Sequence, residues 1–202
     1  MKDFAERFDS PVPATRPRGA RLLEAYSPKL ERRVRFFDHL AFSQWIRLEA
    51  EPGVLKFCER PARVDRHPDS CLIDFWIQRA DTQKLLLIES RYDLAAQDVD
   101  GLAVDVVPLA ELAAARMWIS NWSRMLPVIS ATRFLVPQSL SKALLGRVVE
   151  PQPLARLERE LSVGDAAVVR GAIFELLRTG QLRAPSLHHQ PLDLHLMLEP
   201  VS

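Results

Sequence analysis

The sequence predicts an α/β protein, in which an α/β sandwich is followed by a smaller helical domain that ends in a β-hairpin. Three observations carry this prediction. Apolar residues recur at helical spacing in residues 27–42, short apolar runs punctuated by turn residues fill residues 54–107, and two closely spaced helical segments after residue 150 precede two alternating segments. At 202 residues, 48% of them apolar, the chain can bury roughly 70% of its unfolded surface without a disulfide or structural metal.

Composition indicates the cellular location of the protein better than it indicates the function. The chain has 27 Lys+Arg, 26 Asp+Glu and only two cysteines, and its formal net charge is +1. Two cysteines cannot form a zinc cage, and a reduced cytoplasmic location is the default expectation. We find neither an N-terminal signal peptide nor a run of about 18 apolar residues, so the sequence predicts no membrane segment.

The first predicted element is a flexible arm, which is followed by a helix. Residues 1–22 contain Pro11, Pro13 and Pro17, which disfavour regular structure, and are predicted to be a mobile N-terminal arm. From residue 27 the apolar positions follow helical spacing, with Ser27 as N-cap and Pro28 in the first turn. The spacing predicts a helix over residues 27–42.

The middle of the chain predicts a sheet. The runs VLKFC, CLIDFWI, KLLLIES and AVDVV are separated by segments rich in Pro or charged residues, and they predict strands. The continuously apolar stretch at residues 85–88 is typical of a strand covered on both faces. A helix over residues 109–125 follows, and together these elements predict one domain over residues 23–126.

The C-terminal third predicts a winged helix. Residues 127–150, punctuated by prolines, are predicted to be a connector with one short helix at residues 140–145. Residues 151–202 then contain a helix at 154–161, a second helix from an Asp165 cap to Gly180, and two alternating segments that predict a hairpin. This order of elements is typical of a winged helix.

Two acidic residues on predicted neighbouring strands could form a chemical site. Asp74 lies within CLIDFWI, where an ionised carboxylate needs a cation or hydrogen-bond donors as partners. Glu89 ends KLLLIES, and Arg91 projects from the same face two residues later. If the two strands are neighbours, Asp74 and Glu89 can hold Mg²⁺ and Arg91 can stabilise charge on a phosphate.

Glu31 is the third acidic candidate. Its helical neighbour Arg35 lies four residues on, so a surface ion pair would account for Glu31 taken alone. Its conjunction with Asp74 and Glu89 favours a functional role.

These residues resemble a known family. The order YSPKLERRVRFFDHLAFS, VLKFCERPARV, LIDFWI and LLLIES, over about residues 24–125, is similar to the TnsA endonuclease subunit of heteromeric transposases. The resemblance implies the PD-(D/E)xK fold, which is a restriction-endonuclease-like α/β sandwich with a mixed central sheet. The winged helix predicted after it corresponds to that family's second domain.

The resemblance also implies a site, a cofactor and partners. Glu31, Asp74 and Glu89 would be the metal ligands and catalytic acids for Mg²⁺, with Mn²⁺ as a substitute. The implied partners are DNA at transposon ends, a DDE-type transposase and an ATP-dependent transposition regulator. The implied activity is metal-dependent hydrolysis of a phosphodiester at those ends.

One position departs from the family pattern. The family's lysine is here Arg91, and arginine is planar and cannot lose its proton, so the exchange is not conservative. Lys84, Lys56 or Lys29 could supply an ammonium group instead. The sequence therefore leaves a second hypothesis open, a catalytically degenerate nuclease-fold subunit that binds DNA and assembles the transposition complex. A solitary repair or restriction-type nuclease is a third.

Other candidates have simpler explanations. Arg60 could reach the site or a DNA backbone, although an exposed arginine at a strand end is the favoured explanation. The cysteines and His67, His188 and His189 lack metal-ligand spacing. In the second domain four arginines could contact phosphates, but the wing has none after Arg183, so protein docking is at least as well supported. These four are Arg156, Arg159, Arg170 and Arg178.

Overall fold

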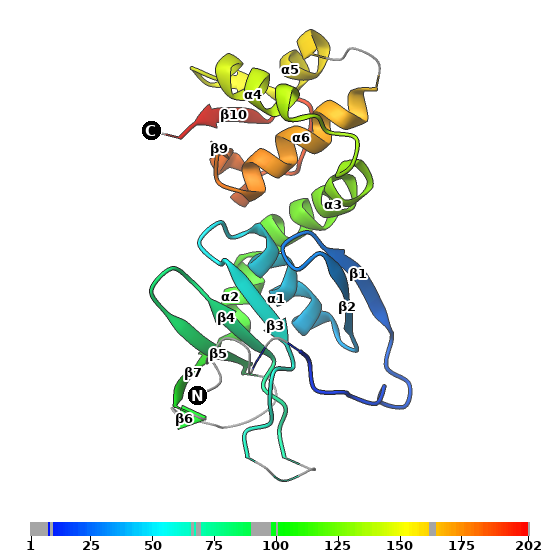
Figure 1. Cartoon of the computed structure of the whole chain (residues 1–202), viewed down its shortest axis with the longest axis vertical. Helices are drawn as coiled ribbons and strands as arrows, with labels where there is room; N and C mark the ends of the chain where they lie inside the picture. The colour runs from blue at the N-terminus through cyan, green and yellow to red at the C-terminus, as the bar shows by residue number, and fades with distance from the viewer. Residues whose placement is uncertain are drawn as a thin grey trace. The chain divides into compact units, whose positions relative to one another are not determined.

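The computed structural model (Figure 1) describes residues 8, 10–65, 67, 70–89, 98, 99, 101–161 and 165–201. The chain divides into two compact units. Unit 1 comprises Met1–Leu48 and Gly53–Ala114, and unit 2 comprises Glu49–Pro52 and Ala115–Ser202. No helix in the described ranges is both long and apolar enough to cross a membrane.

Unit 1 is built on a five-stranded mixed sheet in the order β3-β4-β5-β7-β6. The antiparallel strands β3, β4 and β5 are followed by β7, which pairs parallel to β5, and β6 pairs antiparallel to β7. The mixed α/β class predicted from the sequence is therefore confirmed. The strands are β3 Lys56–Glu59, β4 Phe75–Gln78, β5 Gln83–Ile88, β6 Asp98–Val99 and β7 Leu102–Val107.

Both faces of this sheet are covered. The register aligns Cys58, Trp76, Leu85 and Val104 across four strands, and this row is buried in a cluster that also contains Phe8. On the other face Phe75 packs against Phe36, which in turn packs against Trp45 of helix α1 (His39–Ala50). Burial on both faces explains the continuously apolar sequence of β5.

The helix predicted over residues 27–42 is wrong. Residues 23–36 form the hairpin β1 (Leu23–Ser27) and β2 (Arg32–Phe36), and the helix α1 begins only at His39. In β2 the buried Val34 and Phe36 alternate with exposed arginines, which is a period of two. Asp38 caps α1 in place of Ser27, because its Oδ1 accepts from the Ala41 N–H (2.8 Å).

The predicted flexible arm at residues 1–22 is only partly an arm. Phe8 is 1% exposed, and its ring lies 6.0 Å from that of Trp76. Further on, the Val12 N–H donates to the Arg60 carbonyl (2.8 Å). Phe8 and Val12 are therefore held against the rest of unit 1, whereas residues 15–19 are exposed. Residues 1–7 and 9 lie outside the described residues.

The predicted connector at residues 127–150 is wrong, because most of it is helical. Helix α3 (Arg116–Thr132) continues through Pro127, and α4 (Gln138–Arg147) extends well beyond the short helix predicted there. The helix predicted at residues 109–125 is divided between α2 (Leu109–Ala114) and the first part of α3. The first unit therefore ends near residue 114 rather than 126.

The rest of unit 2 agrees closely with the predicted elements. Helix α5 spans Leu154–Leu161, and α6 spans Ala166–Arg178, with the Asp165 side chain accepting from the Ala167 N–H. A short 3₁₀ helix, Pro185–His188, interrupts the predicted hairpin. Its two strands, β9 (Leu182–Arg183) and β10 (Met197–Pro200), still pair antiparallel, and β8 (Gln152–Pro153) adds a third strand in the order β8-β10-β9.

Candidate functional site

Asp74 directly precedes β4, and its carboxylate accepts a hydrogen bond from the neighbouring strand β5. Its side chain is 5% exposed, and Oδ2 accepts from the N–H of Ile88, the last residue of β5 (2.8 Å). Its own N–H donates to the Leu86 carbonyl. A backbone donor thus meets part of the need that the sequence predicts for this buried acid.

Glu89 directly follows Ile88, so the structure places Asp74 and Glu89 at the same end of two neighbouring strands. Glu89 is exposed. Its Oε2 accepts from the Leu109 N–H at the first turn of α2 (3.0 Å), and its N–H donates to the Val107 carbonyl. Its carboxylate therefore satisfies one of the unpaired donors at the start of that helix.

Among the described residues, Glu31 does not form a metal-binding group with these two acids. It lies in the turn between β1 and β2 with a positive φ of 52°. Lys29 in the same turn donates to the Leu48 carbonyl near the C-terminal end of α1 (2.6 Å), whereas Asp38 and Asp74 line one cavity at the N-terminal end.

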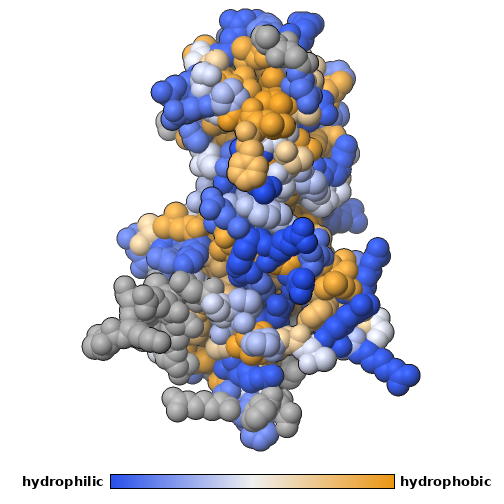
Figure 2. All heavy atoms as spheres, turned by 45° about the vertical axis from the view of Figure 1, so that its right-hand side comes forward, coloured by the Kyte–Doolittle hydropathy of each residue, from blue (hydrophilic) through white to orange (hydrophobic). Residues whose placement is uncertain are grey.

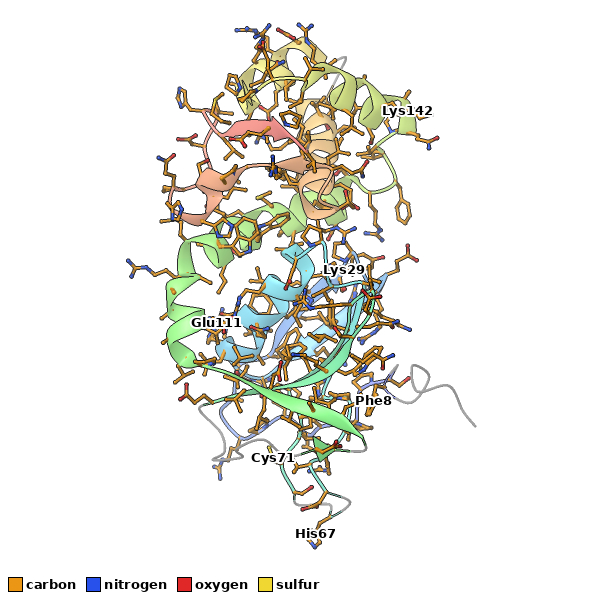
Figure 3. The ribbon with its side chains drawn as sticks, turned by 90° about the vertical axis from the view of Figure 1, so that its left-hand side faces the viewer. Phe8, Lys29, His67, Cys71, Glu111 and Lys142 are labelled. Carbon is orange, nitrogen blue, oxygen red and sulfur yellow. The ribbon has the colours of Figure 1, made fainter. Side chains whose placement is uncertain are left out.

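In Figure 3 Lys29, in the turn between β1 and β2, lies toward one end of unit 1, and Cys71, in the segment before β4, lies toward the other. The difference from the prediction follows from the secondary structure, because a hairpin turn replaces the helix on which Glu31 was expected.

The cation predicted for the site is Arg91. Arg91 lies outside the described residues. The three alternative lysines lie away from Asp74: Lys29 is in the hairpin turn, and Lys56 begins β3 at the end opposite Glu59. Lys84 pairs with Asp105 (2.7 Å) and precedes Ile88 by four strand residues, which is about 13 Å.

A cavity of about 260 Å³ opens beside Asp74. Its charged lining consists of Asp38, Glu59, Arg60 and Asp74. Ala14, Thr15 and Pro17 of the N-terminal segment line the same cavity. Sequence reasoning missed Asp38 and Glu59. The available signal for Asp38 was its place before an apolar segment, where a helix cap is expected.

Glu59 is neutralised within the fold. It is 2% exposed and makes a two-pronged ion pair with Arg32, with donor–acceptor distances of 2.7 and 2.6 Å. Hydrogen bonding to Glu59 raises the pKa of Arg32, so the arginine stays charged beside the buried carboxylate. This pair accounts for Glu59 structurally.

Arg60 joins three segments at the cavity. Its N–H donates to the Asp74 carbonyl (2.9 Å), its carbonyl accepts from Val12, and its Nη1 donates to the Arg35 carbonyl (2.7 Å). Its φ is 49°, and its guanidinium lies 5.8 Å from the centre of the Phe37 ring. Burial lowers its pKa, and its Nε is buried without a hydrogen-bond partner among the described residues.

The predicted Mg²⁺ centre can be tested against these positions. Asp74 and Glu89 each have one carboxylate oxygen engaged by a backbone N–H. Within the described ranges, no three His, Cys, Asp or Glu side chains form a group that could hold a metal ion. The described residues do not fit the predicted three-carboxylate site.

The arginines considered as phosphate contacts in unit 2 are mostly engaged. Arg170 makes a two-pronged ion pair with Glu158, and Arg178 makes one with Glu175. Arg156 pairs with Glu160, while Arg159 is exposed. Helix α6 is itself largely buried, including its Val169, Gly171, Ala172, Ile173, Phe174, Leu176, Leu177 and Arg178.

The histidine and cysteine candidates, and three of the tryptophans, have structural surroundings. Cys58 is buried in the core of unit 1, and the His188 ring stacks on Trp118 at 4.1 Å and 6°. Burial and the neighbouring His189 lower the pKa of His188. Trp45, Trp76 and Trp122 are each no more than 2% exposed, as expected of core residues.

Comparison with known proteins adds no relative. A scan against protein-family models gives no match, and neither does a comparison with curated protein sequences. The family resemblance therefore stays a prediction that depends on the residues quoted for it.

Proposed function

We propose that the chain is a nuclease-fold subunit of a DNA transposition complex, which binds DNA and docks partner proteins without cutting DNA itself. The observation that carries this proposal is that the three acids do not form a metal-binding group among the described residues. Asp74 and Glu89 lie at the ends of neighbouring strands, where each accepts a backbone N–H. These contacts give Asp74 and Glu89 structural roles.

The fold supports the family part of the proposal. A mixed sheet with α1 packed on one face is compatible with a restriction-endonuclease-like sandwich. In unit 2 the order α4, β8, α5, α6, β9, β10, with β8, β9 and β10 in one sheet, is compatible with a winged helix. We infer these finer fold assignments from the element order.

Unit 2 is better suited to protein docking than to reading DNA. A winged helix that reads the major groove exposes its second helix, but α6 is buried along most of its length. Two of its arginines are held in ion pairs with Glu158 and Glu175, and so are less available to phosphates. The protein partners implied by the family resemblance are a DDE-type transposase and an ATP-dependent regulator. The complex would assemble in the cytoplasm on DNA at transposon ends.

A second candidate is the Mg²⁺-dependent endonuclease itself. One observation favours it, because Asp74 and Glu89 lie at the ends of adjacent strands, as the family resemblance implies. Arg91 would then supply the positive charge beside them. A solitary nuclease remains the third hypothesis.

Metal binding and cleavage distinguish these candidates. Isothermal titration calorimetry with Mn²⁺ and Mg²⁺ should give the same heats for the wild-type chain and for Asp74→Asn if the chain does not cut. Cleavage of end-containing DNA with the cognate partners should likewise not depend on Asp74. Saturable metal binding that is lost in Asp74→Asn, together with partner-dependent cleavage, would establish the endonuclease instead. Nicking without partners would favour the solitary nuclease.

A further inference from the structure

Positive charge is concentrated near the N-terminal end of the described chain. Residues 10–37 contain seven Lys or Arg and two Glu, a net charge of +5, whereas the whole chain has a net charge of +1. The remainder therefore carries a net charge of −4. Six of the seven bases are arginines, whose planar guanidinium matches a phosphate in a two-pronged contact.

Five of these arginines are exposed, and we refer to them together as the basic face. Arg33 and Arg35 project from β2 with side chains 76% and 64% exposed, and both contact Glu24 on β1. The other three follow one another in the segment before β1. The basic face consists of Arg16, Arg18, Arg21, Arg33 and Arg35.

The arginines before β1 are available to a ligand. Among the described residues, Arg16 donates only to the Ala20 carbonyl (2.6 Å). Neither Arg18 nor Arg21 has a side-chain hydrogen bond or an ion pair with any described residue. Glu24 therefore offsets charge on the hairpin but not on this segment. Figure 2, which brings the β1–β2 side forward, shows hydrophilic side chains over much of this face of unit 1.

The basic face adjoins the cavity beside Asp74. Arg60 connects the two parts of the face, because its carbonyl accepts from Val12 and its guanidinium donates to the Arg35 carbonyl. Thr15 and Pro17, which flank Arg16, line the cavity. The N-terminal segment, the hairpin and the candidate site thus meet at one place in unit 1.

We propose that the basic face is the surface through which unit 1 binds the phosphate backbone of duplex DNA. This inference rests on the proposed function, which supplies DNA as the partner, and it assigns binding to residues outside the predicted site. Neutralising phosphates with arginines releases counterions, so the binding is independent of sequence and weakens steeply with salt. Glu24 opposes it by holding Arg33 and Arg35.

Fluorescence anisotropy with a labelled random-sequence duplex tests the proposal on the full chain. We expect the combined variant Arg16→Gln, Arg18→Gln, Arg21→Gln to bind about tenfold or more weakly, with the slope of log K against log salt reduced by about 3. Glu24→Gln should bind more tightly. The matched control Arg116→Gln, Arg159→Gln, Arg183→Gln removes the same charge from exposed positions of unit 2 and should change binding less.

The outcomes separate this inference from the proposed function. Equal weakening by the two triple variants would overturn the basic face and leave DNA binding by the chain intact. Wild-type protein that does not bind the duplex at low salt, but does bind an acidic protein, would overturn both proposals. If circular dichroism shows that the first variant is unfolded, the single change Arg18→Gln decides, with an expected loss of about one unit of salt slope against none for Arg159→Gln.

Discussion

Asp74 illustrates how far a single residue can be interpreted from sequence. An acid among Ile73, Phe75 and Trp76 needs a partner, and that need is visible in the sequence. Which partner meets it depends on strand register, which places Ile88 N–H 2.8 Å from the carboxylate. A metal ion and a backbone donor satisfy the same chemical need, so the residue type alone does not choose between them.

The same contact gives a prediction about stability. Asp74→Ala leaves the buried N–H of Ile88 without its acceptor, and we expect a loss of about 1–3 kcal/mol in the free energy of unfolding. Asp74→Asn retains an oxygen that can accept and should lose less. Urea unfolding monitored by tryptophan fluorescence measures both changes.

Glu89→Ala is the matched comparison for Asp74→Ala. It removes the acceptor for the Leu109 N–H at an exposed helix start, where the expected cost is about 0.5–1 kcal/mol. An Asp74→Ala chain as stable as the wild type would show that the hydrogen bond to Ile88 does not hold the strand ends together.

At the scale of elements, the sequence predicts best where local signals agree. Helices α5 and α6 lie where expected, because Asp165 is a good cap and Gly180, with φ of 72°, is a good stop. Residues 27–42 mislead, because Leu30, Val34 and Phe37 fit a helical period while Val34 and Phe36 also fit a strand period. Residues 32–36 form a strand because they pair with β1, where Glu24 contacts Arg33 and Arg35. Most of β1 lies before residue 27, outside the segment that shows the helical period.

The misassigned helix also explains the misplaced site residue. The family resemblance joins Glu31 to Asp74 and Glu89, and it requires Glu31 to lie on the helix predicted over residues 27–42. The hairpin instead presents Arg32 to Glu59, and α1 presents Asp38 to the cavity. Asp74 and Glu89 can be predicted to lie close together from the pairing of neighbouring strands alone. Predicting the position of Glu31 also requires the tertiary packing of the hairpin.

Helices α3 and α6 of unit 2 approach closely at Gly171, which has no side chain. A Cβ added to Gly171 in α6 would lie 1.9 Å from Oγ1 and 2.9 Å from Cβ of Thr132 in α3. We expect Gly171→Ala to lower the free energy of unfolding by about 1–3 kcal/mol, because the two helices must separate. Differential scanning calorimetry measures the effect.

Two further variants test this explanation. Gly146→Ala in the exposed face of α4 meets nothing within 4 Å and should stabilise the chain by about 0.5–1 kcal/mol. Combining Gly171→Ala with Thr132→Ala removes the nearest atom and should recover part of the loss. If Thr132→Ala gives no recovery, the cost of Gly171→Ala arises elsewhere in α6.

At the scale of the whole molecule, the boundary that the prolines predict between the two units differs from the observed one. Pro127 lies inside α3 and does not end it, since Met125, Leu126 and Ile129 on either side are buried in the core of unit 2. Tertiary burial here outweighs a local breaker. The boundary instead falls between α2 and α3, where the sequence has no Pro or Gly to mark it.

This boundary predicts that residues 115–202 fold without unit 1. The fragment retains a core of its own, which includes Trp122, Ile173 and Phe174. It lacks Pro52, whose ring packs close to Gly180, so its stability should fall below that of unit 2 in the full chain. We expect a helical circular dichroism spectrum and one cooperative thermal transition, both lost in Phe174→Asp. A fragment without cooperative unfolding would mean that the docking module proposed for unit 2 cannot act as a separate domain.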